Sequence, residues 1–237
     1  MEKDGSPLSV LVIVATLNEE EGIGPTLAEL REALKDALED PRFLVVDGNS
    51  MDRTVEIAKE MGTDVLFQEG IGKGNAIAHA IKHVDLDVKY VVFIDADFTY
   101  PAEYLPEMIR ILEENPEVGM VTGNRFNHEY ELTSMRDPFF FGNRFLAFAQ
   151  HLLNGVKLQD PLTGLRVVRW RILTNWKPKS KGFDIEAEMN HRVERLGYKT
   201  VEIPIHYRTR LGEKKLRLRH GFSILKRILS ESFLDQF

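Results

Sequence analysis

Short apolar runs that fit strands buried on both faces are the feature that most constrains this chain. Residues 8–15 read L-S-V-L-V-I-V-A, a nearly continuous run typical of a strand with helices packed on both sides. The apolar residues that follow recur at helical spacing until Asp40 and Pro41 stop the pattern. The chain therefore opens with a buried strand followed by a helix.

The same alternation continues along the chain. Strand-like runs recur at residues 43–46, 64–67, 90–94 and 118–122, and helical patterns lie between them at 54–61, 75–83 and 101–115. This alternation predicts an α/β fold with a mainly parallel sheet flanked by helices. Further helices are expected at 139–153, 184–196 and 221–237, with a strand that ends at Ile205.

The sequence predicts a single domain. No internal repeat, low-complexity tract or linker divides the chain. We expect the domain to cover residues 8–218, preceded by an extension at 1–7 and followed by a C-terminal amphipathic helix at 219–237. The apolar stripe of that helix is expected to contain Phe222, Leu225, Leu229 and Phe233.

The composition excludes several classes of protein. With 43% hydrophobic and 29% charged residues, the chain resembles ordinary soluble proteins, and no apolar run reaches the roughly 18 residues that a membrane-spanning helix needs. The first residues lack the basic and apolar stretches of a secretory signal, so a cytoplasmic location is expected. The chain has no cysteine, so any metal must bind oxygen or histidine.

The charge is distributed unevenly. Residues 208–227 contain eight Lys or Arg and one acid, which gives this window a charge of +7 in a chain whose net charge is −6. A local basic surface on an acidic protein predicts a specific anionic partner, such as a diphosphate or a membrane surface, and argues against nucleic acid. The alternative is a solvated basic face.

Distinctive polar residues follow four of the predicted strands. They lie at residues 16–19, 47–50, 69–74 and 95–97. Because parallel strands present their functional loops beyond their carboxyl ends, these four segments are expected to converge on one crevice.

Asp95 and Asp97 follow a buried strand directly, in F-I-D-A-D. Two carboxylates at a sheet edge suit Mg²⁺ or Mn²⁺, which prefer oxygen ligands and commonly share them with substrate phosphates. The simpler alternative, two solvated acids in a loop, is disfavoured by their position after the strand. We therefore predict a divalent metal site on Asp95 and Asp97.

Two neighbouring segments allow more than one interpretation. Asp47 ends a strand, where it can accept hydrogen bonds from a base or a ribose, whereas Asp52 suits the N-cap of the next helix. The segment G-I-G-K-G at 70–74 fits neither the dinucleotide fingerprint nor the P-loop. Its Lys73 suits either a phosphate contact or a solvated position.

Together, these motifs resemble a known family. A-T-L-N-E-E, V-V-D-G-N-S-M-D-R-T, G-K-G-N-A-I and F-I-D-A-D-F-T-Y-P resemble the inverting family 2 glycosyltransferases of GT-A fold. Two C-terminal segments, L-Q-D-P-L-T-G-L-R-V-V-R at 158–169 and G-Y-K-T-V-E-I-P-I-H-Y-R-T-R-L-G-E-K-K-L at 197–216, are similar to those of dolichyl-phosphate mannose synthases and related polyprenyl-phosphate hexose synthases. The resemblance covers roughly residues 8–218.

The resemblance implies a role for each matching residue. Asp95 and Asp97 would hold the metal and the diphosphate, and Asp160 would lie near the transferred sugar and the acceptor phosphate, so that Asp97 and Asp160 are the expected catalytic residues. The residues expected to bind the nucleotide sugar are Thr16, Asn18, Glu19, Asp47, Lys73, Asp95, Arg125, Arg208, Arg210, Lys214 and Lys215.

The implied activity is transfer of a hexose from GDP-mannose, UDP-glucose or UDP-N-acetylglucosamine to dolichyl or polyprenyl phosphate. It implies Mg²⁺ or Mn²⁺ as cofactor and a peripheral position on the cytosolic membrane face, and it leaves room for a membrane-anchoring partner. Two alternatives remain. One is a glycosyltransferase with a sugar hydroxyl as acceptor, for which Asp160 would be the general base, and the other is a non-catalytic nucleotide-sugar-binding module.

Some positions depart from the family pattern. Phe98, Thr99 and Tyr100 follow Asp97 where dolichyl-phosphate mannose synthases usually have L-Q-H, and Lys214 stands where serine is usual. These departures leave the sugar open. The aromatic run at 139–148 suits either a core helix or a membrane-facing groove for the acceptor, and the basic residues before the last helix favour docking on an anionic leaflet.

Overall fold

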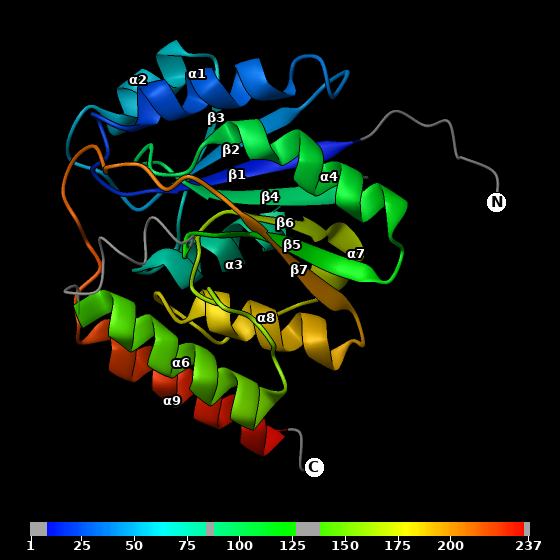
Figure 1. The fold of residues 1–237 in the computed structure, drawn as a ribbon. Helices are drawn as coiled ribbons and strands as arrows, with labels where there is room; N and C mark the ends of the chain where they lie inside the picture. Colours follow the sequence, from blue (N-terminus) through cyan, green and yellow to red (C-terminus); the bar gives the residue numbers. More distant parts are fainter. Residues whose placement is uncertain (1–8, 84–87, 127–137, 235–237) are drawn as a thin grey trace.

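A seven-stranded sheet is the centre of the molecule (Figure 1). The computed structural model describes residues 9–83, 88–126 and 138–234. Within these ranges the strands are β1 (Val10–Thr16), β2 (Arg42–Asp47), β3 (Asp64–Phe67), β4 (Tyr90–Asp95), β5 (Val118–Asn124), β6 (Arg166–Arg169) and β7 (Lys199–Pro204). Their order across the sheet is β3-β2-β1-β4-β6-β5-β7.

The helices form layers on both faces of this sheet (Figure 1). In chain order they are α1 (Ile23–Leu34), α2 (Thr54–Glu60), α3 (Lys73–His83), the 3₁₀ turn η1 (Ala102–Tyr104), α4 (Leu105–Glu114), α6 (Pro138–Asn154), α7 (Trp170–Leu173), α8 (Ile185–Arg195) and α9 (His220–Leu234). α1, α2 and α4 cover one face, and α3 and α8 cover the other. α6 and α9 form an outer layer beyond α8.

The predicted mainly parallel sheet is confirmed. β1 pairs in parallel with β2 and β4, β3 with β2, and β7 with β5. β6 is antiparallel to both of its neighbours, β4 and β5. The chain runs from β1 outward through β2 to β3 and then returns to place β4 on the other side of β1. The loops after β1 and β4 therefore meet at a switch point, where α/β sheets bind ligands.

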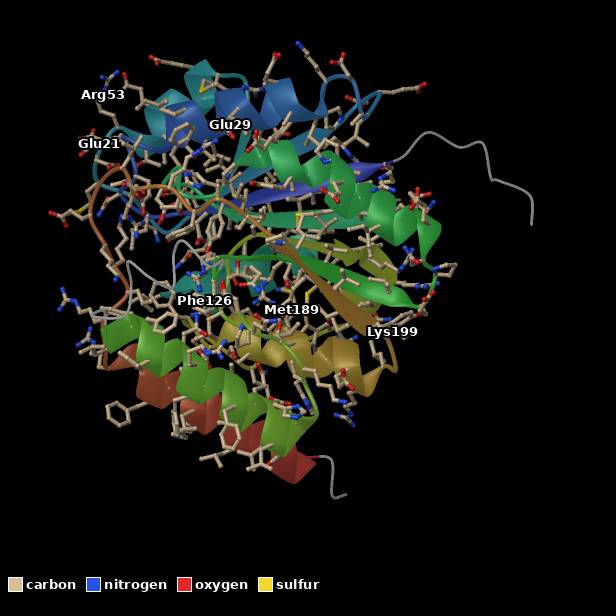
Figure 2. All side chains as sticks on the ribbon, viewed as in Figure 1. Glu21, Glu29, Arg53, Phe126, Met189 and Lys199 are labelled. Carbon is tan, nitrogen blue, oxygen red and sulfur yellow. The ribbon has the colours of Figure 1, made fainter. Side chains whose placement is uncertain are left out.

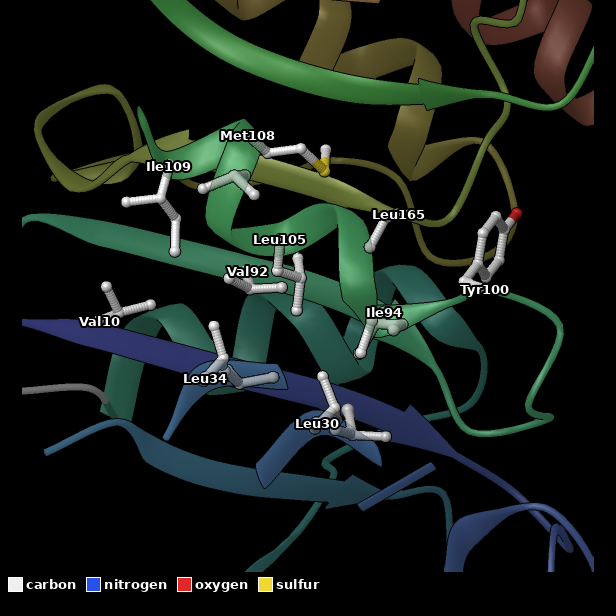
Figure 3. Close-up of a cluster of buried hydrophobic side chains, with 14 of the residues drawn as sticks. Val10, Leu30, Leu34, Val92, Ile94, Tyr100, Leu105, Met108, Ile109 and Leu165 are labelled. Atoms are coloured by element: carbon white, nitrogen blue, oxygen red, sulfur yellow. The ribbon is translucent and has the colours of Figure 1, made fainter. Parts of the chain in front are cut away.

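The continuous apolar run of β1 is explained by two cores. Val10, Val12 and Val14 point into the cluster that contains α1 and α4, and Leu11 and Ile13 point into the cluster that contains α3 and α8. Figure 3 shows the first cluster, which contains Leu30 and Leu34 of α1, Val92 of β4 and Leu105 of α4. Both faces of the strand are thus buried, as the sequence indicates.

Several element boundaries differ from those expected. The helix predicted to reach Asp40 ends at Leu34, although Leu38 is still buried and so keeps the apolar spacing. The helix predicted at 101–115 is a 3₁₀ turn followed by α4. β6 was not predicted, because its four residues begin and end with arginines, and both arginines are buried in the sheet.

The C-terminal helix packs against the domain. Leu146 and Ala149 of α6, Ala187 of α8, and Ile224 and Ile228 of α9 form a third apolar cluster. Arg227 Nε of α9 lies 3.4 Å from Asp184 Oδ2 and 3.6 Å from Glu188 Oε2 of α8. The expected extension at 1–7, residues 235–237 and the side chain of Phe233 lie outside the described part of the structure. Among the described helices, none is long and apolar enough to cross a bilayer.

Replacement of two glycines by alanine should change the stability of the protein in opposite directions. A Cβ on Gly22 would lie 2.8 Å from the Cα of Asp97, whereas a Cβ on Gly142 of α6 would meet no atom within 4 Å. Gly22→Ala should lower the free energy of unfolding by about 1–3 kcal/mol because of overpacking. Gly142→Ala should raise it by about 0.5–1 kcal/mol because alanine favours the helix. Urea unfolding followed by circular dichroism measures both, and equal effects would contradict the close approach of Gly22 to the Asp97 loop.

Candidate functional site

The loops after β1 and β2 are joined by hydrogen bonds that use several of the predicted site residues. The backbone N–H of Ser50 and its hydroxyl donate to the two oxygens of Asp47, at 2.8 Å and 2.5 Å. The Asn18 side-chain oxygen accepts from the Met51 N–H at 2.8 Å. Asp47 and Asn18 therefore shape the rim of the crevice through contacts within the protein, and the expected contact of Asp47 with a nucleoside stays a prediction.

Asp52 also holds this rim. The N-cap of α2 is Arg53 and not Asp52, so the predicted position is off by one residue, but Asp52 Oδ1 still accepts the N–H of Thr54, the first residue of the helix, at 3.0 Å. Asp52 Oδ2 accepts the Glu20 N–H at 3.1 Å. One aspartate thus links the loop after β1 to the helix after β2.

The turn after β4 directs Asp97 inward. Phe98 adopts a left-handed backbone conformation with φ of 64°, which is unusual for a bulky residue. Asp97 is buried, and its Oδ1 accepts the backbone N–H and the hydroxyl of Thr99 at 3.1 Å and 2.5 Å. Thr99, which departs from the family pattern, therefore orients the second carboxylate of the motif.

Lys73 bridges two carboxylates below this turn. Its Nζ lies 2.5 Å from Asp95 Oδ1 and 2.7 Å from Glu186 Oε1 of α8. Burial alone would lower the pKa of Lys73, but these two carboxylates raise it well above its usual value. Lys73 is thus a largely buried cation paired with two carboxylates, so the solvated alternative is wrong, and its expected phosphate contact stays a prediction.

The glycines around Lys73 have a packing role. A Cβ on Gly74 would meet the backbone of Ser180 and Lys181, and Gly72 has φ of +100° against the same segment. The glycines let the start of α3 approach residues 180–182 closely. This explains the glycine-rich segment without a P-loop, in agreement with the sequence analysis.

A basic loop from residues 205–219 crosses the carboxyl ends of β1 and β4 (Figure 1, orange). Arg210 Nη2 lies 2.6 Å from Glu19 Oε1 and 3.0 Å from Asp97 Oδ2. Lys215 Nζ lies 2.6 Å from the same Glu19 oxygen. The Leu211 N–H also donates to the backbone oxygen of Asp97 at 3.0 Å. Two predicted cations, Arg210 and Lys215, are thus brought onto two predicted acids.

Burial affects the charge of those acids. Burial raises the pKa of Asp97, as does the neighbouring charge of Asp95. Burial likewise raises the pKa of Glu19, although Lys215 and Arg210 oppose it. In both residues the cations of the loop favour the ionised form, so the loop and the carboxylates stabilise each other.

The other two basic residues of the loop lie elsewhere. Arg208 pairs with Glu29 of α1 at 2.5 Å and stacks over the Phe98 ring at 4.6 Å. Lys214 Nζ lies 3.5 Å from the centroid of the Phe139 ring at the start of α6. The structure does not place either beside Asp97, so their expected phosphate contacts stay predictions.

Asp160 is fully buried and has no free oxygen. Arg125 donates to it through Nε and Nη2, both at 2.7 Å, and through its backbone N–H at 3.0 Å. Asn143 of α6 donates to Oδ1 at 3.0 Å. Burial would lower the pKa of Arg125, but the charge of Asp160 raises it well above its usual value. The two predicted site residues thus form a buried ion pair.

Hydrogen bonds with β6 and β7 fix the segment that carries Asp160. Glu202 of β7 accepts the N–H groups of Gln159 and Asp160 at 2.7 Å and 2.8 Å, and burial raises its pKa. Arg166 of β6 donates to the carbonyls of Thr163 and Pro161 at 2.9 Å and 2.6 Å. The arginine of D-P-L-T-G-L-R therefore has a structural role, because it fixes the loop.

Asp160 and the Asp95–Asp97 motif belong to one site. A Cβ on Gly164 would collide with the Asp95 carboxylate, and the Gly164 N–H donates to the Tyr100 hydroxyl at 2.7 Å. Three residues that shape this site, Asn143, Glu186 and Glu202, were not predicted from the sequence. Asn143 could have been noticed as an amide within the apolar run F-F-F-G-N-R-F, but nothing in the sequence pairs Glu186 with Lys73.

The donor set fits a divalent cation that shares its ligands with a substrate. Asp95 and Asp97 offer hard carboxylate oxygens, and among the described residues no three acids or histidines converge to hold an ion alone. Mg²⁺ and Mn²⁺ sites often take remaining ligands from phosphates. Buried polar atoms of Thr16, Glu19 and Arg210 also lack hydrogen-bond partners in the described structure, so they are free to accept from or donate to a molecule in the crevice.

The Arg125–Asp160 pair can be tested through stability alone. Arg125→Met should lower the free energy of unfolding by about 3–5 kcal/mol, because it leaves the Asp160 carboxylate buried without its cation. In the Arg125→Met, Asp160→Asn double variant the total cost should be smaller than the sum of the single costs, since no charge remains unpaired. Urea unfolding of the four proteins gives the coupling energy, and additive costs would show that the pair does not form.

The comparisons with known proteins agree with this geometry. The model of the family described as glycosyl transferase family 2 matches residues 11–174, a range that contains Asp95, Asp97, Arg125 and Asp160. A dolichyl-phosphate hexose transferase of Haloferax volcanii is 36% identical over 209 residues, which are 86% of this chain and 85% of that protein. Glycosyltransferase AglJ of the same organism is 31% identical over 202 residues, 85% of this chain and 64% of its own.

The fold has solved counterparts. Glucosyl-3-phosphoglycerate synthase from Mycobacterium tuberculosis superposes with a TM-score of 0.73 at 20% identity, over 95% of this chain and 80% of that one. At this identity the likeness concerns the fold alone. It confirms the GT-A fold expected from the sequence.

Proposed function

The chain belongs to glycosyl transferase family 2, and from this premise we propose that it transfers a hexose from a nucleotide-diphosphate sugar to dolichyl or polyprenyl phosphate, with inversion at the sugar. Membership of the family makes it a glycosyltransferase. The donor, the lipid acceptor, the metal and the reaction at the cytosolic membrane face are parts of the proposal. Its support comes from the charges of the site and from the dolichyl-phosphate hexose transferase to which the chain is similar.

The observation that carries the acceptor assignment is the occupation of Asp160. A hydroxyl acceptor needs a base to take its proton, but both oxygens of Asp160 are engaged by Arg125 and Asn143. A phosphate acceptor is already ionised and needs no base. Arg125 uses its Nε and Nη2 donors on Asp160, so its support for a phosphate acceptor is the positive charge that it places beside the acceptor position.

The donor end of the site is built for a diphosphate. Asp95 and Asp97 would hold the metal, which when bound neutralises the charge that develops on the departing diphosphate. Arg210 and Lys215 would transfer from Glu19 and Asp97 to the phosphates, because a charged ligand competes for the same cations. The acceptor phosphate oxygen forms the bond to the anomeric carbon, and the electrons of the broken bond leave with the diphosphate. Lys73 stays between Asp95 and Glu186 and holds Asp95 in place.

One assay tests the reaction. The protein is incubated with labelled GDP-mannose, UDP-glucose or UDP-N-acetylglucosamine, with dolichyl phosphate and Mn²⁺, and the mixture is extracted into organic solvent. We expect lipid-soluble label from one of these donors and none without dolichyl phosphate. Only water-soluble products would refute the lipid acceptor and favour a hydroxyl acceptor, and no turnover under any condition would favour a binding module.

The role of Asp97 has its own prediction. Asp97→Ala should lower turnover by about 100-fold or more, because it removes a group that stabilises developing charge. Asp64→Ala is the matched control, since Asp64 is an exposed aspartate at the start of the edge strand β3, and it should leave turnover unchanged. Full activity of Asp97→Ala would end the assignment.

Replacement of Arg210 should change the affinities for Mn²⁺ alone and for a nucleoside diphosphate with Mn²⁺ in opposite directions. Arg210→Met removes a cation 3.0 Å from Asp97, so Mn²⁺ alone should bind about fivefold more tightly if the pair contributes about 1 kcal/mol. A nucleoside diphosphate with Mn²⁺ should bind more weakly, because a phosphate partner is lost. Titration calorimetry measures both, with Arg110→Met as control because Arg110 pairs with Glu114 on the exposed side of α4. Changes of the same sign would contradict the proposed exchange.

A further inference from the structure

α6 exposes a stripe of large apolar side chains. Phe141, Phe145, Phe148 and Leu152 recur at intervals of four, three and four residues and are between 58% and 69% exposed. Residues at these intervals share one face of a helix. Soluble proteins rarely expose contiguous apolar patches of this kind without a binding role.

α9 extends the same surface. It lies beside α6 in the outer layer of the molecule (Figure 1), and Phe222 is 79% exposed on it. Figure 2 shows side chains of both helices, aromatic rings among them, pointing away from the sheet. We call this surface the outer face, and it consists of Phe141, Phe145, Phe148, Leu152, Phe222 and Leu229.

The charge around the outer face is positive. The segments 138–158 and 214–226 contain seven Lys or Arg and no Asp or Glu, in a chain whose net charge is −6. All of these cations except Lys215 are exposed, namely Arg144, Lys157, Lys214, Arg217, Arg219 and Lys226. Aromatic and aliphatic side chains flanked by Lys and Arg are typical of helices that lie in a membrane interface.

This charge also argues against a second copy as the partner. A symmetric dimer brings the same patch of both subunits together, so the cations of one outer face would meet those of the other. An anionic lipid surface offers the complementary charge, and each Lys or Arg near it contributes about 1 kcal/mol.

α6 connects the outer face to the site. Its inner side carries Asn143, which is buried and donates to Asp160 at 3.0 Å, and its opposite side carries Phe141 and Phe145. A helix is about 10–12 Å across with its side chains. Asp160 therefore lies about one helix diameter behind the outer face, and an apolar helix face inserts about 5–10 Å into the interface.

An open groove runs along the same helix. It has a volume of about 450 Å³ and is lined by Arg144, Ala147, Phe148 and His151 of α6 and by Lys157, Leu158 and Gln159. Gln159 precedes Asp160 directly. The groove thus borders the outer face and reaches Gln159, the residue before Asp160, whereas the buried Asp160 carboxylate does not line it.

We propose that the outer face docks on an anionic lipid bilayer, with Phe141, Phe145 and Leu152 in the interface and the surrounding cations on the headgroups. The inference deepens the proposed function, on which it rests for its purpose: the docked helix places Asp160 and Arg125 at the depth of a lipid phosphate. The docking itself needs only the lipid surface and no acceptor.

Vesicle binding tests the docking without the reaction. The full chain is sedimented with phosphatidylcholine vesicles, with and without phosphatidylglycerol, in the absence of any polyprenyl phosphate. We expect binding to the anionic vesicles that weakens as salt is added. Phe145→Ser with Leu152→Ser should weaken it at least tenfold, since each buried side chain contributes about 1.5–3 kcal/mol.

A matched variant controls for the loss of exposed apolar area. Phe67→Ser changes a phenylalanine that is 49% exposed on the edge strand β3, and it should bind vesicles as the unaltered protein does. Equal vesicle binding of the Phe145→Ser, Leu152→Ser variant and the unaltered protein would overturn the proposal. So would a lipid-free dimer that this variant converts to a monomer, because a second copy would then cover the outer face.

The reaction is measured separately, in detergent with a short-chain polyprenyl phosphate. The variant should keep its turnover there, because neither residue contacts Asp160 or the Asp95–Asp97 motif. Turnover lost in detergent would show that the stripe supports the site and not the docking. If the unaltered protein binds anionic vesicles but transfers no sugar, the proposed function fails and the docking stands.

Discussion

The neutralisation of buried carboxylates is the constraint on which the rest of this structure depends. A carboxylate removed from water is strongly unfavourable unless a cation and hydrogen bonds accompany it. Arg210 pairs with both Asp97 and Glu19, and Lys215 pairs with Glu19. In the case of Glu19 the two cations come from a loop almost two hundred residues away in the sequence. Asp160 pairs with Arg125. Each pair joins segments that the sheet alone would leave independent, so the charges assemble the site as well as supply its chemistry.

The sequence predicted the scaffold of this site well. The apolar runs of β1 and β4 and the spacing of α1 and α4 follow from burial on two faces, which a one-dimensional pattern records. The partners of the polar residues could not be read in the same way. Asp47 is the last residue of β2 and bonds to its own loop, whereas Asp97 lies two residues beyond the end of β4 and bonds to Thr99 and Arg210. Both loops contain a residue with a left-handed backbone, Asn49 and Phe98, so the different partners follow from the loop paths and from the distant Arg210, which no local pattern records.

The departure at Thr99 shows how local context changes the meaning of a motif. Judged against the family pattern, Thr99 removes a glutamine that could supplement the metal shell. In the structure its hydroxyl and N–H hold Asp97 Oδ1, which leaves Oδ2 directed at Arg210. The substitution thus fixes which carboxylate oxygen is available to an incoming cation. Oδ2 lies against the loop cation Arg210, which in the proposed reaction would also serve the diphosphate, so metal and diphosphate would be coupled through one guanidinium.

At the proposed acceptor end of the site, the helix α6 likewise has two roles. Its sequence alternates between residues that the domain needs and residues that it leaves exposed: Asn143 and Leu146 face inward, and Phe141 and Phe145 face outward. A helix that served only as cover for α8 would have no physical reason to expose phenylalanines at four-residue spacing, since polar residues there would cost nothing in packing. The inward amide also ties the position of the helix to Asp160. In the proposed docked state, the helix that meets the lipid is therefore the helix that orients the buried ion pair, and the distance from membrane to site is set by one layer of rigid structure.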